Sequence, residues 1–170
     1  MKKTGLLCLA VMLALGTLGV GYAMWDKTLY IDATVHTGEV NMKIISVASD
    51  DPPGTIDRGK DKDVGWTEVI IDPMDDQRML VTIHNGYPCY EVYLHFTGHN
   101  NGTIPVKLQD IIVTVPPELS VSAWDGMGEQ VDPGENCDNS ASVHVEQEAE
   151  ELTTYTFTVE FYYVQWNEYH

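Results

Sequence analysis

A strict alternation of apolar and polar side chains dominates the last part of this 170-residue chain. From residue 153 to residue 164, large apolar side chains recur at every second position, and threonine or glutamate fills most positions between them. Because side chains of a β-strand point to opposite faces with a period of two, this pattern predicts a strand with one buried face. That face consists of Tyr155, Phe157, Val159, Phe161 and Tyr163.

Similar alternation recurs in shorter segments, and turn-forming pairs such as Asn85-Gly86 and Pro133-Gly134 separate them. These residue pairs adopt the backbone angles that tight turns require. About nine short strands separated by turns predict an all-β domain, built as a two-sheet sandwich of jelly-roll or immunoglobulin-like type. We expect strands at residues 25–35, 40–44, 66–71, 79–84, 90–97, 104–115, 119–124, 142–146 and 153–164.

A hydrophobic leader precedes this β-rich part. Two lysines are followed by an uncharged stretch from residue 4 to residue 25, with Gly21-Tyr22-Ala23 near its end. A positive start, an apolar middle and a small-x-small end are typical of a secretory signal peptide, which signal peptidase removes during export. We therefore expect residues 1–23 to be a signal helix and the product to be secreted or displayed at the cell surface.

Two other fates of the leader remain open from the sequence. The uncharged stretch is long enough to stay as an uncleaved membrane anchor. A prepilin-type leader cut after Gly5 would instead keep the apolar helix as the core of a filament. In every case the length of residues 24–170 suits a single β-sandwich domain with one hydrophobic core.

The charge of the chain is strongly one-sided. It contains 26 acidic and nine basic residues, which gives a formal net charge of −17 at pH 7. Such a surface repels nucleic acid, because phosphate binding requires lysine and arginine to displace counterions. We therefore expect no nucleic-acid partner, whereas solubility outside the cell and cation binding both suit the acidic surface.

Acidic residues gather in two turn-rich segments, and these segments are candidates for a calcium site. Calcium takes six to eight oxygen ligands, so clustered carboxylates on a loop are the side chains that such a site needs. The spacing of an EF-hand is absent, and a solvated acidic loop is the alternative. The main candidates are Asp50, Asp51, Asp57, Asp61 and Asp63, and a second loop carries Asp72, Asp75 and Asp76.

Cys89 and Cys137 are the two cysteines that follow the leader. An even pair in an exported chain is a candidate disulfide, and two free thiols are the alternative. Asn101-Gly102-Thr103 matches the acceptor pattern for N-glycosylation, which makes Asn101 a candidate glycosylation site on a surface turn.

No motif predicts an enzyme. Neither Gly-x-Ser-x-Gly nor His-Glu-x-x-His occurs, so neither a serine esterase nor a common zinc protease is indicated. His95 and His99 lie close in the sequence, but a zinc site needs a third ligand, and scattered surface histidines are the simpler interpretation. Exposed aromatic rings would suit a carbohydrate- or surface-binding module, although alternating rings are more typical of a core. The tryptophans are Trp25, Trp66, Trp124 and Trp166.

Three short motifs resemble one protein family. The leader runs into a short segment that ends in Thr-Gly-Glu-Val-Asn-Met at residues 37–42, and residues 96–106 join two strands through an Asn-x-Gly turn and an Ile-Pro step. The alternating residues 155–159 resemble the closing strand of the same family. In these features the chain resembles the camelysin/TasA family of exported fibre and biofilm-matrix proteins. The Asp-rich loop and residues 164–168 depart from the family pattern.

The resemblance implies a jelly-roll subunit of the extracellular matrix that a dedicated signal peptidase releases. It also implies self-assembly into filaments, in which the segment freed by cleavage adds a strand to a neighbouring copy. Because camelysin has been classed among metallopeptidases, a peptidase activity is a further, less favoured implication. From the residues alone, the segment could equally be the first strand of its own sheet. The candidate donor strand is residues 24–36, with Trp25, Leu29, Ile31, Ala33 and Val35 on its apolar face.

Overall fold

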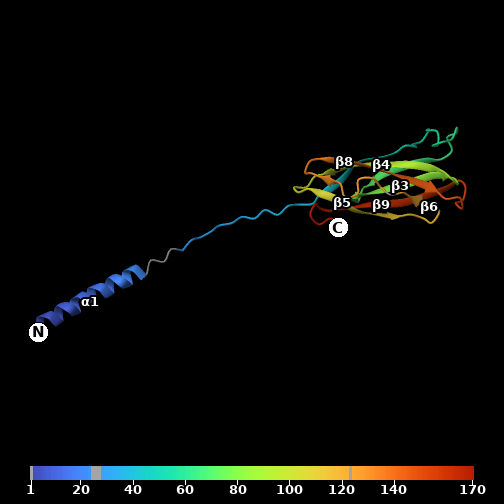
Figure 1. Cartoon of the computed structure of the whole chain (residues 1–170). Coiled ribbons are helices and arrows are strands. Elements are labelled where there is room, and N and C mark those ends of the chain that lie inside the picture. Colours follow the sequence, from blue (N-terminus) through green and yellow to red (C-terminus); the bar gives the residue numbers. More distant parts are fainter. Residues whose placement is uncertain (1, 24–27, 123) are drawn as a thin grey trace. The chain divides into compact units, whose positions relative to one another are not determined.

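The computed structural model describes residues 2–23, 28–122 and 124–170, which contain one helix and nine strands. The chain divides into two compact units, Met1–His36 and Thr37–His170. The helix belongs to the first unit and all nine strands belong to the second (Figure 1).

The helix α1 (Lys2–Ala23) coincides with the predicted leader. Leucine, alanine and methionine, which favour helix, fill most of residues 6–15. The side chains of residues 3–18 are exposed, and apolar side chains occur on every side of the helix. Within the described residues, no helix reaches the length and apolarity that crossing a membrane requires.

Residues 28–36 form no strand, although the sequence predicted one from residue 25 to residue 35. The exposed fractions of Leu29, Ile31 and Val35 are 81%, 79% and 82%. The prediction of a half-buried strand is therefore wrong for residues 28–35 within their own chain, because no described strand pairs with them. Trp25 lies outside the described residues.

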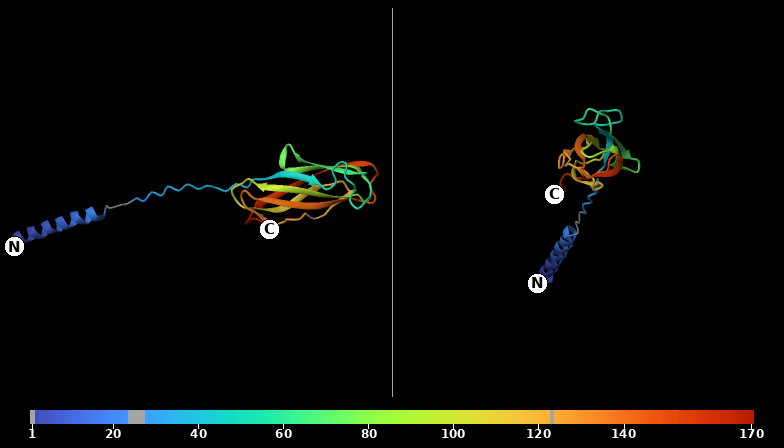
Figure 2. Two further views of the ribbon diagram at one scale, coloured as in Figure 1. Left: turned by 90° about the horizontal axis from the view of Figure 1, so that it is seen from above. Right: turned by 90° about the vertical axis from the view of Figure 1, so that its right-hand side faces the viewer.

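Two antiparallel sheets form the second unit, which confirms the predicted all-β sandwich (Figure 2). The first sheet has the order β1-β4-β8-β6, and its strands are β1 (Met42–Ser49), β4 (Glu91–Asn100), β8 (Asn136–Val145) and β6 (Leu119–Val121). The second sheet has the order β2-β3-β9-β5-β7, and its strands are β2 (Trp66–Asp72), β3 (Asp75–Gly86), β9 (Thr153–Gln165), β5 (Val106–Thr114) and β7 (Gln130–Val131).

Aromatic side chains fill the centre of the sandwich. The rings of Phe96 on β4 and Phe161 on β9 join the two sheets, with centroids 3.9 Å apart. Trp124 meets Phe96 at 5.7 Å and Phe161 at 5.4 Å, in both cases edge-on. The alternation of β9 holds as predicted, because Thr154, Thr156 and Glu160 are exposed while alternate positions are buried. The buried side chains are those of Tyr155, Phe157, Val159, Phe161 and Tyr163.

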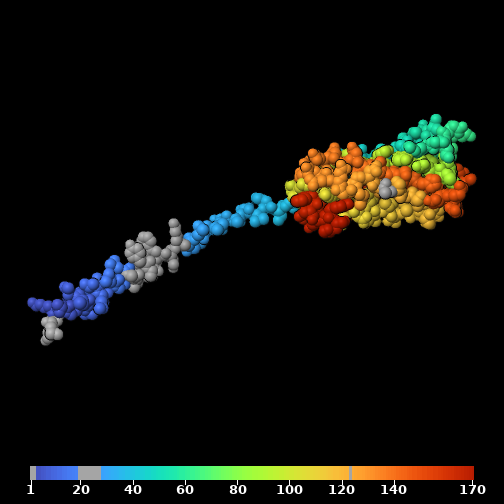
Figure 3. Space-filling view, in the orientation of Figure 1, coloured from blue at the N-terminus to red at the C-terminus, as the bar shows by residue number. Residues whose placement is uncertain are grey.

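The two long sides of the sandwich differ. On one side, the loop of residues 50–65 joins the edge strands β1 and β2, and Thr67 N donates to Asp51 O at 2.8 Å. On the other side, β6 ends the first sheet, and β7 extends the second sheet beyond β5 by only two residues. Figure 3 shows the surface of this region in yellow and orange, with the C-terminal residues in red beside it.

Candidate functional site

A groove lies between β5 and the segment that follows it. After β5 the chain crosses to the other sheet at Pro116-Pro117, forms β6 on β8, and returns to the second sheet as β7. β7 pairs with β5 only at Val106 and Lys107, so in the described part of the chain residues 119–127 form no strand pair with β5. The separation of these two edges leaves a groove of about 380 Å³.

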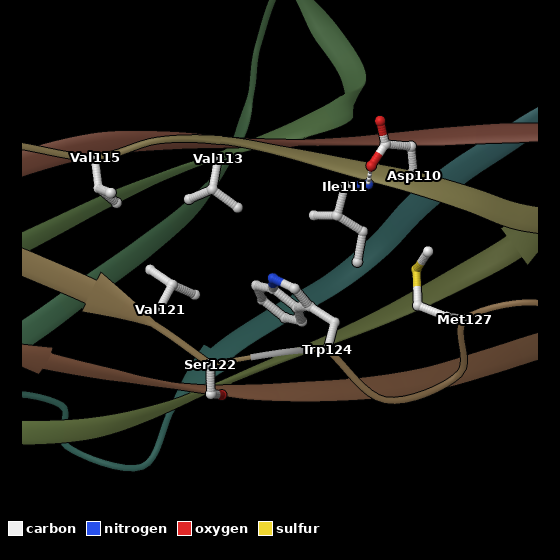
Figure 4. Close-up of a pocket in the computed structure, with 8 residues that line it drawn as sticks. All are labelled: Asp110, Ile111, Val113, Val115, Val121, Ser122, Trp124 and Met127. Atoms are coloured by element: carbon white, nitrogen blue, oxygen red, sulfur yellow. Dashed lines mark hydrogen bonds between the residues drawn. The ribbon is translucent and has the colours of Figure 1, made fainter.

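Apolar side chains line the groove from both edges, as Figure 4 shows. A β-bulge between Leu108 and Asp110 resets the alternation of β5. Ile111 and Val113 are therefore half-buried at the groove, whereas Asp110 and Ile112 are exposed. The lining residues are Asp110, Ile111, Val113, Val115, Val121, Ser122, Trp124 and Met127.

Trp124 forms the floor of the groove and is only 7% exposed. Its ring rests on the core phenylalanines, and its nitrogen lies on the side of the indole that faces Val113 of β5 (Figure 4). Nε1 is buried and has no hydrogen-bond acceptor in the described part of the chain. A buried donor without an acceptor destabilises a fold by about 1–3 kcal/mol, so this N–H gains from any acceptor that enters the groove.

The groove is bounded by two strand edges that are open to a further strand. Among the described strands, β5 has no strand partner beyond Lys107 on the side away from β9, and β6 has none on the side away from β8. Leu108 O already accepts from Gly128 N at 2.9 Å, and Ile111 N donates to Asp110 Oδ1 at 2.8 Å, so an added strand would pair with the part of β5 that follows Ile111. Unpaired edges present rows of N–H and C=O groups that accept an added strand. The arrangement can therefore bind an extended peptide with apolar side chains on one face.

Residues 28–36 have the pattern and the length that such a groove requires. Leu29, Ile31, Ala33 and Val35 alternate with polar or mixed side chains, and all of them are exposed. From Leu29 to Val35 an extended chain measures about 20 Å. The stretch that lines the groove from residue 110 to residue 115, which begins in β5 and ends one residue after it, measures about 17 Å. The chain thus carries both an apolar segment without a partner strand and a groove of matching length.

The predicted calcium ligands of the first acidic loop serve other contacts. Asp50 accepts from Arg58 NH1 at 2.9 Å and from Tyr93 N at 2.7 Å. Asp57, which is 1% exposed, accepts from Val64 N at 2.8 Å and from the Tyr87 hydroxyl at 2.7 Å. These bonds hold the loop in its turn conformation.

Asp51 is also 1% exposed and accepts from the Tyr90 hydroxyl at 2.6 Å. Asp61 and Asp63 are exposed. No three His, Cys, Asp or Glu side chains gather as metal ligands anywhere in the described ranges, so the structure does not bring the five aspartates together as a site.

The second acidic segment is a turn between β2 and β3. Asp72 accepts from Met74 N at 2.9 Å and from Arg78 Nε at 2.6 Å, and both contacts lower the pKa of its carboxyl group. Asp76 pairs with Lys43 at 3.1 Å, and Asp75 accepts from Gln77 N at 3.0 Å. Asp72 and Asp75 thus stabilise the turn, and Asp76 links it to Lys43 of β1.

The predicted disulfide is not formed, because Cys89 and Cys137 lie at opposite ends of β8. Cys89 N donates to Val145 O at one end, whereas Cys137 pairs with Gly98 near the other. The eight residue steps from Cys137 to Val145 span about 26 Å in a strand, and a disulfide requires Cα atoms closer than about 7 Å. Both cysteines are free thiols, and Cys89 is exposed.

The remaining candidates lie apart from the groove. His95 and His99 share one face of β4 but stand four residues apart, about 13 Å, and His99 Nδ1 lies 2.7 Å from Asn136 Oδ1. Asn101 is exposed directly after β4, where a glycosylation acceptor would be accessible.

The three tryptophans that the structure describes form no continuous row. Trp66 stacks on His84 at 3.7 Å, Trp124 is buried, and Trp166 is 52% exposed in the C-terminal turn. The sequence placed Trp124 at the end of a strand but gave no indication that its ring would form a groove floor.

Comparisons of the chain with protein-family models, with curated proteins and with solved structures give no match. Fold and site therefore define the class: an all-β sandwich with one open side and an exposed apolar segment outside its core.

Proposed function

We propose that this chain is an exported, non-enzymatic structural subunit of a cell-surface or extracellular-matrix filament. Residues 28–36 of one copy enter the groove between β5 and β6 of the next copy and add a strand there. The observation that carries this proposal is the presence, in one chain, of an exposed apolar segment and an apolar groove of comparable length.

Strand addition suits both parts energetically. An inserted strand gains main-chain hydrogen bonds from the open edges, and its apolar face leaves water for the groove. Leu29, Ile31 and Val35, which are about four-fifths exposed, would be buried on insertion. Each fully buried side chain of this size contributes about 1.5–3 kcal/mol.

The geometry of donation leads to an open polymer. Each copy has one donor segment and one groove, so the contact is head-to-tail, and such contacts generate filaments when the rotation between copies does not close a ring. Removal of the leader by signal peptidase would free the donor segment only after export. This sequence of events keeps assembly outside the cell, in agreement with the resemblance to exported fibre proteins.

The test uses the chain from residue 24 onward, whose sandwich has its own core. Filaments are followed by light scattering and electron microscopy. Ile31→Glu places a charge on the donor face and should abolish assembly, whereas Thr34→Glu adds the same charge to the opposite face and should leave assembly intact. Filaments formed by Ile31→Glu, or by a chain that lacks residues 24–36, would refute the proposal.

A mixing experiment tests the groove. Val113→Glu should block acceptance but leave donation intact, and circular dichroism with urea unfolding checks that the sandwich remains folded. Neither Ile31→Glu nor Val113→Glu alone should assemble, and their mixture should give heterodimers that stop at two copies by native mass spectrometry. Monomers in the mixture, or in wild type at every concentration, would oppose strand donation and would favour a binding module.

A further inference from the structure

The apolar pattern of the donor segment leaves its register undetermined. A shift of one residue would turn the apolar face away from the groove, but a shift of two residues would keep it inside. The side chains on that face differ in size, because Ala33 is small while Leu29, Ile31 and Val35 are branched. Side-chain polarity allows several registers, so the sizes of the side chains must select one of them.

Trp124 is the residue of the groove that discriminates by size. Its indole lies between Val121 and Met127 along the groove and opposite Ile111 and Val113 (Figure 4). The core phenylalanines behind the ring leave it no room to retreat, since their centroids are 5.7 Å and 5.4 Å away. The ring is thus held in place in the middle of the groove, and a branched side chain placed directly over it would collide with the ring.

We propose that Ala33 of one copy lies over Trp124 of the next copy and that this pairing sets the register of assembly. The inference rests on the proposed function and makes it more specific. In this register the branched side chains on either side of Ala33 lie in the groove to either side of the Trp124 ring. Trp124 Nε1–H then donates to a backbone carbonyl of the inserted segment and gains the acceptor that it lacks in the free subunit.

Substitution of Ala33 tests the pairing without touching the sandwich, because Ala33 is exposed in the free subunit. Ala33→Leu should slow assembly about tenfold to hundredfold, the effect expected when methylene groups are forced into a filled site. Ile31→Leu, a change of shape at constant volume on the same face, is the matched control and should assemble at nearly the wild-type rate. Wild-type assembly by Ala33→Leu would overturn the register while leaving strand donation intact.

A compensating change tests the partner residue. Trp124→Leu makes room above the floor, so the double variant with Ala33→Leu should recover most of the assembly rate that Ala33→Leu lost. Urea unfolding of the Trp124→Leu monomer establishes that the sandwich is folded. Absence of recovery in a folded double variant would overturn the pairing of these two residues.

A peptide-binding experiment detects the hydrogen bond of Trp124 Nε1–H directly and needs no substitution of Trp124. A synthetic peptide of residues 28–37 is added to a chain that lacks residues 24–36, and indole N–H signals are followed by NMR. The Trp124 signal should shift and exchange more slowly with solvent, and Trp66 and Trp166 should not change. The Ala33→Leu peptide should bind at least tenfold more weakly. Equal binding of both peptides, or an unchanged Trp124 signal, would contradict the inference.

Discussion

Tyr90 donates a hydrogen bond from its hydroxyl to Oδ2 of Asp51 at 2.6 Å, and both side chains are 1% exposed. Thr67 Oγ1 lies 2.9 Å from the same hydroxyl, which joins β2 to this pair. These contacts hold the first residues of the 50–65 loop against Tyr90 and Thr67. The 50–65 loop is thereby held across the edges of β1 and β2. The opposite side of the sandwich, between β5 and β6, is where the groove lies.

Tyr90→Phe should lower the free energy of unfolding by about 1–3 kcal/mol, because it leaves both oxygens of a buried carboxylate without a donor. Oδ1 of Asp51 already has no partner among the described residues. Urea unfolding measures the change. Tyr162→Phe, at a tyrosine that is 54% exposed, is the control and should stay within about 0.5 kcal/mol of wild type. An equal effect of the two substitutions would contradict the role of the Tyr90–Asp51 bond.

Asp51→Asn should change the pH dependence of stability. Burial raises the pKa of the Asp51 carboxyl group above its usual 3.8, and nearby carboxylates add to this, whereas the Tyr90 hydrogen bond opposes it. A raised folded-state pKa means that the ionised group costs stability above that pKa, and that the cost disappears as the pH falls through it toward 3.8. The stability of Asp51→Asn relative to wild type should therefore be greatest at neutral pH and should decrease in acid.

The measurement for Asp51→Asn is a series of urea unfolding curves for both proteins between neutral pH and pH values near 3.8. Other titrating groups are common to both chains and cancel in the difference. A difference that stays constant with pH would show that Asp51 has the same pKa in the folded and unfolded states.

Salt should accelerate filament assembly. The formal net charge is −17 for the full chain and −19 for the chain from residue 24 onward, which lacks Lys2 and Lys3, so neighbouring copies repel each other. Raising sodium chloride from about 10 mM to about 150 mM shortens the Debye length from about 30 Å to about 8 Å and screens that repulsion. Light scattering measures the rate. Calcium chloride at equal ionic strength should give a similar rate, and a much faster assembly with calcium would instead indicate a specific calcium site.

The two thiols should both be free in the folded protein. Without reductant, alkylation followed by mass spectrometry should modify Cys89 rapidly, because it is exposed, and Cys137 more slowly, because it is half-buried beside Tyr163. Cys89→Ser should leave the free energy of unfolding within about 0.5 kcal/mol of wild type. An intact mass lower by two hydrogen atoms, with no alkylation, would show a disulfide between Cys89 and Cys137, which this fold does not accommodate.

The exported protein should begin at Met24. A cut after Ala23 is what the small-x-small end of the leader predicts, and it places a free N-terminus just before the donor segment. Intact-mass measurement of material from the culture medium identifies the first residue. A chain that begins at Leu6 would indicate a prepilin fate, and a full-length chain in the membrane fraction would indicate a retained anchor.

Periodicity alone predicted the strands that have strong apolar faces. β9 and β4 were predicted nearly to their ends, because every second side chain is large and apolar. β7 was missed because two residues cannot display a period. The first half of β8 was missed because the polar Asn136, Asp138 and Ser140 alternate with Cys137 and Asn139, which are not markedly apolar.

The candidate site could be predicted only in part. The sequence shows that residues 28–35 have an apolar face, and alternation predicts that this face is buried. It does not tell whether the same chain or another chain buries it. The groove depends on where the chain crosses between sheets after β5, which separates residues 119–127 from β5. No local pattern encodes that separation. The predicted disulfide was wrong for a similar reason, since the sequence does not show that Cys89 lies beside one end of β8 while Cys137 lies near the other.

By itself, the sequence determined the β-class of the domain, most of its inward-facing residues and its acidity, because side-chain polarity and period act locally. The tertiary structure alone decided that residues 28–36 form no strand, that Trp124 lies in a groove and that its N–H has no acceptor among the described residues. The groove arises because the chain crosses from one sheet to the other after β5. It depends on which distant edges meet, and that is a property of the assembled fold.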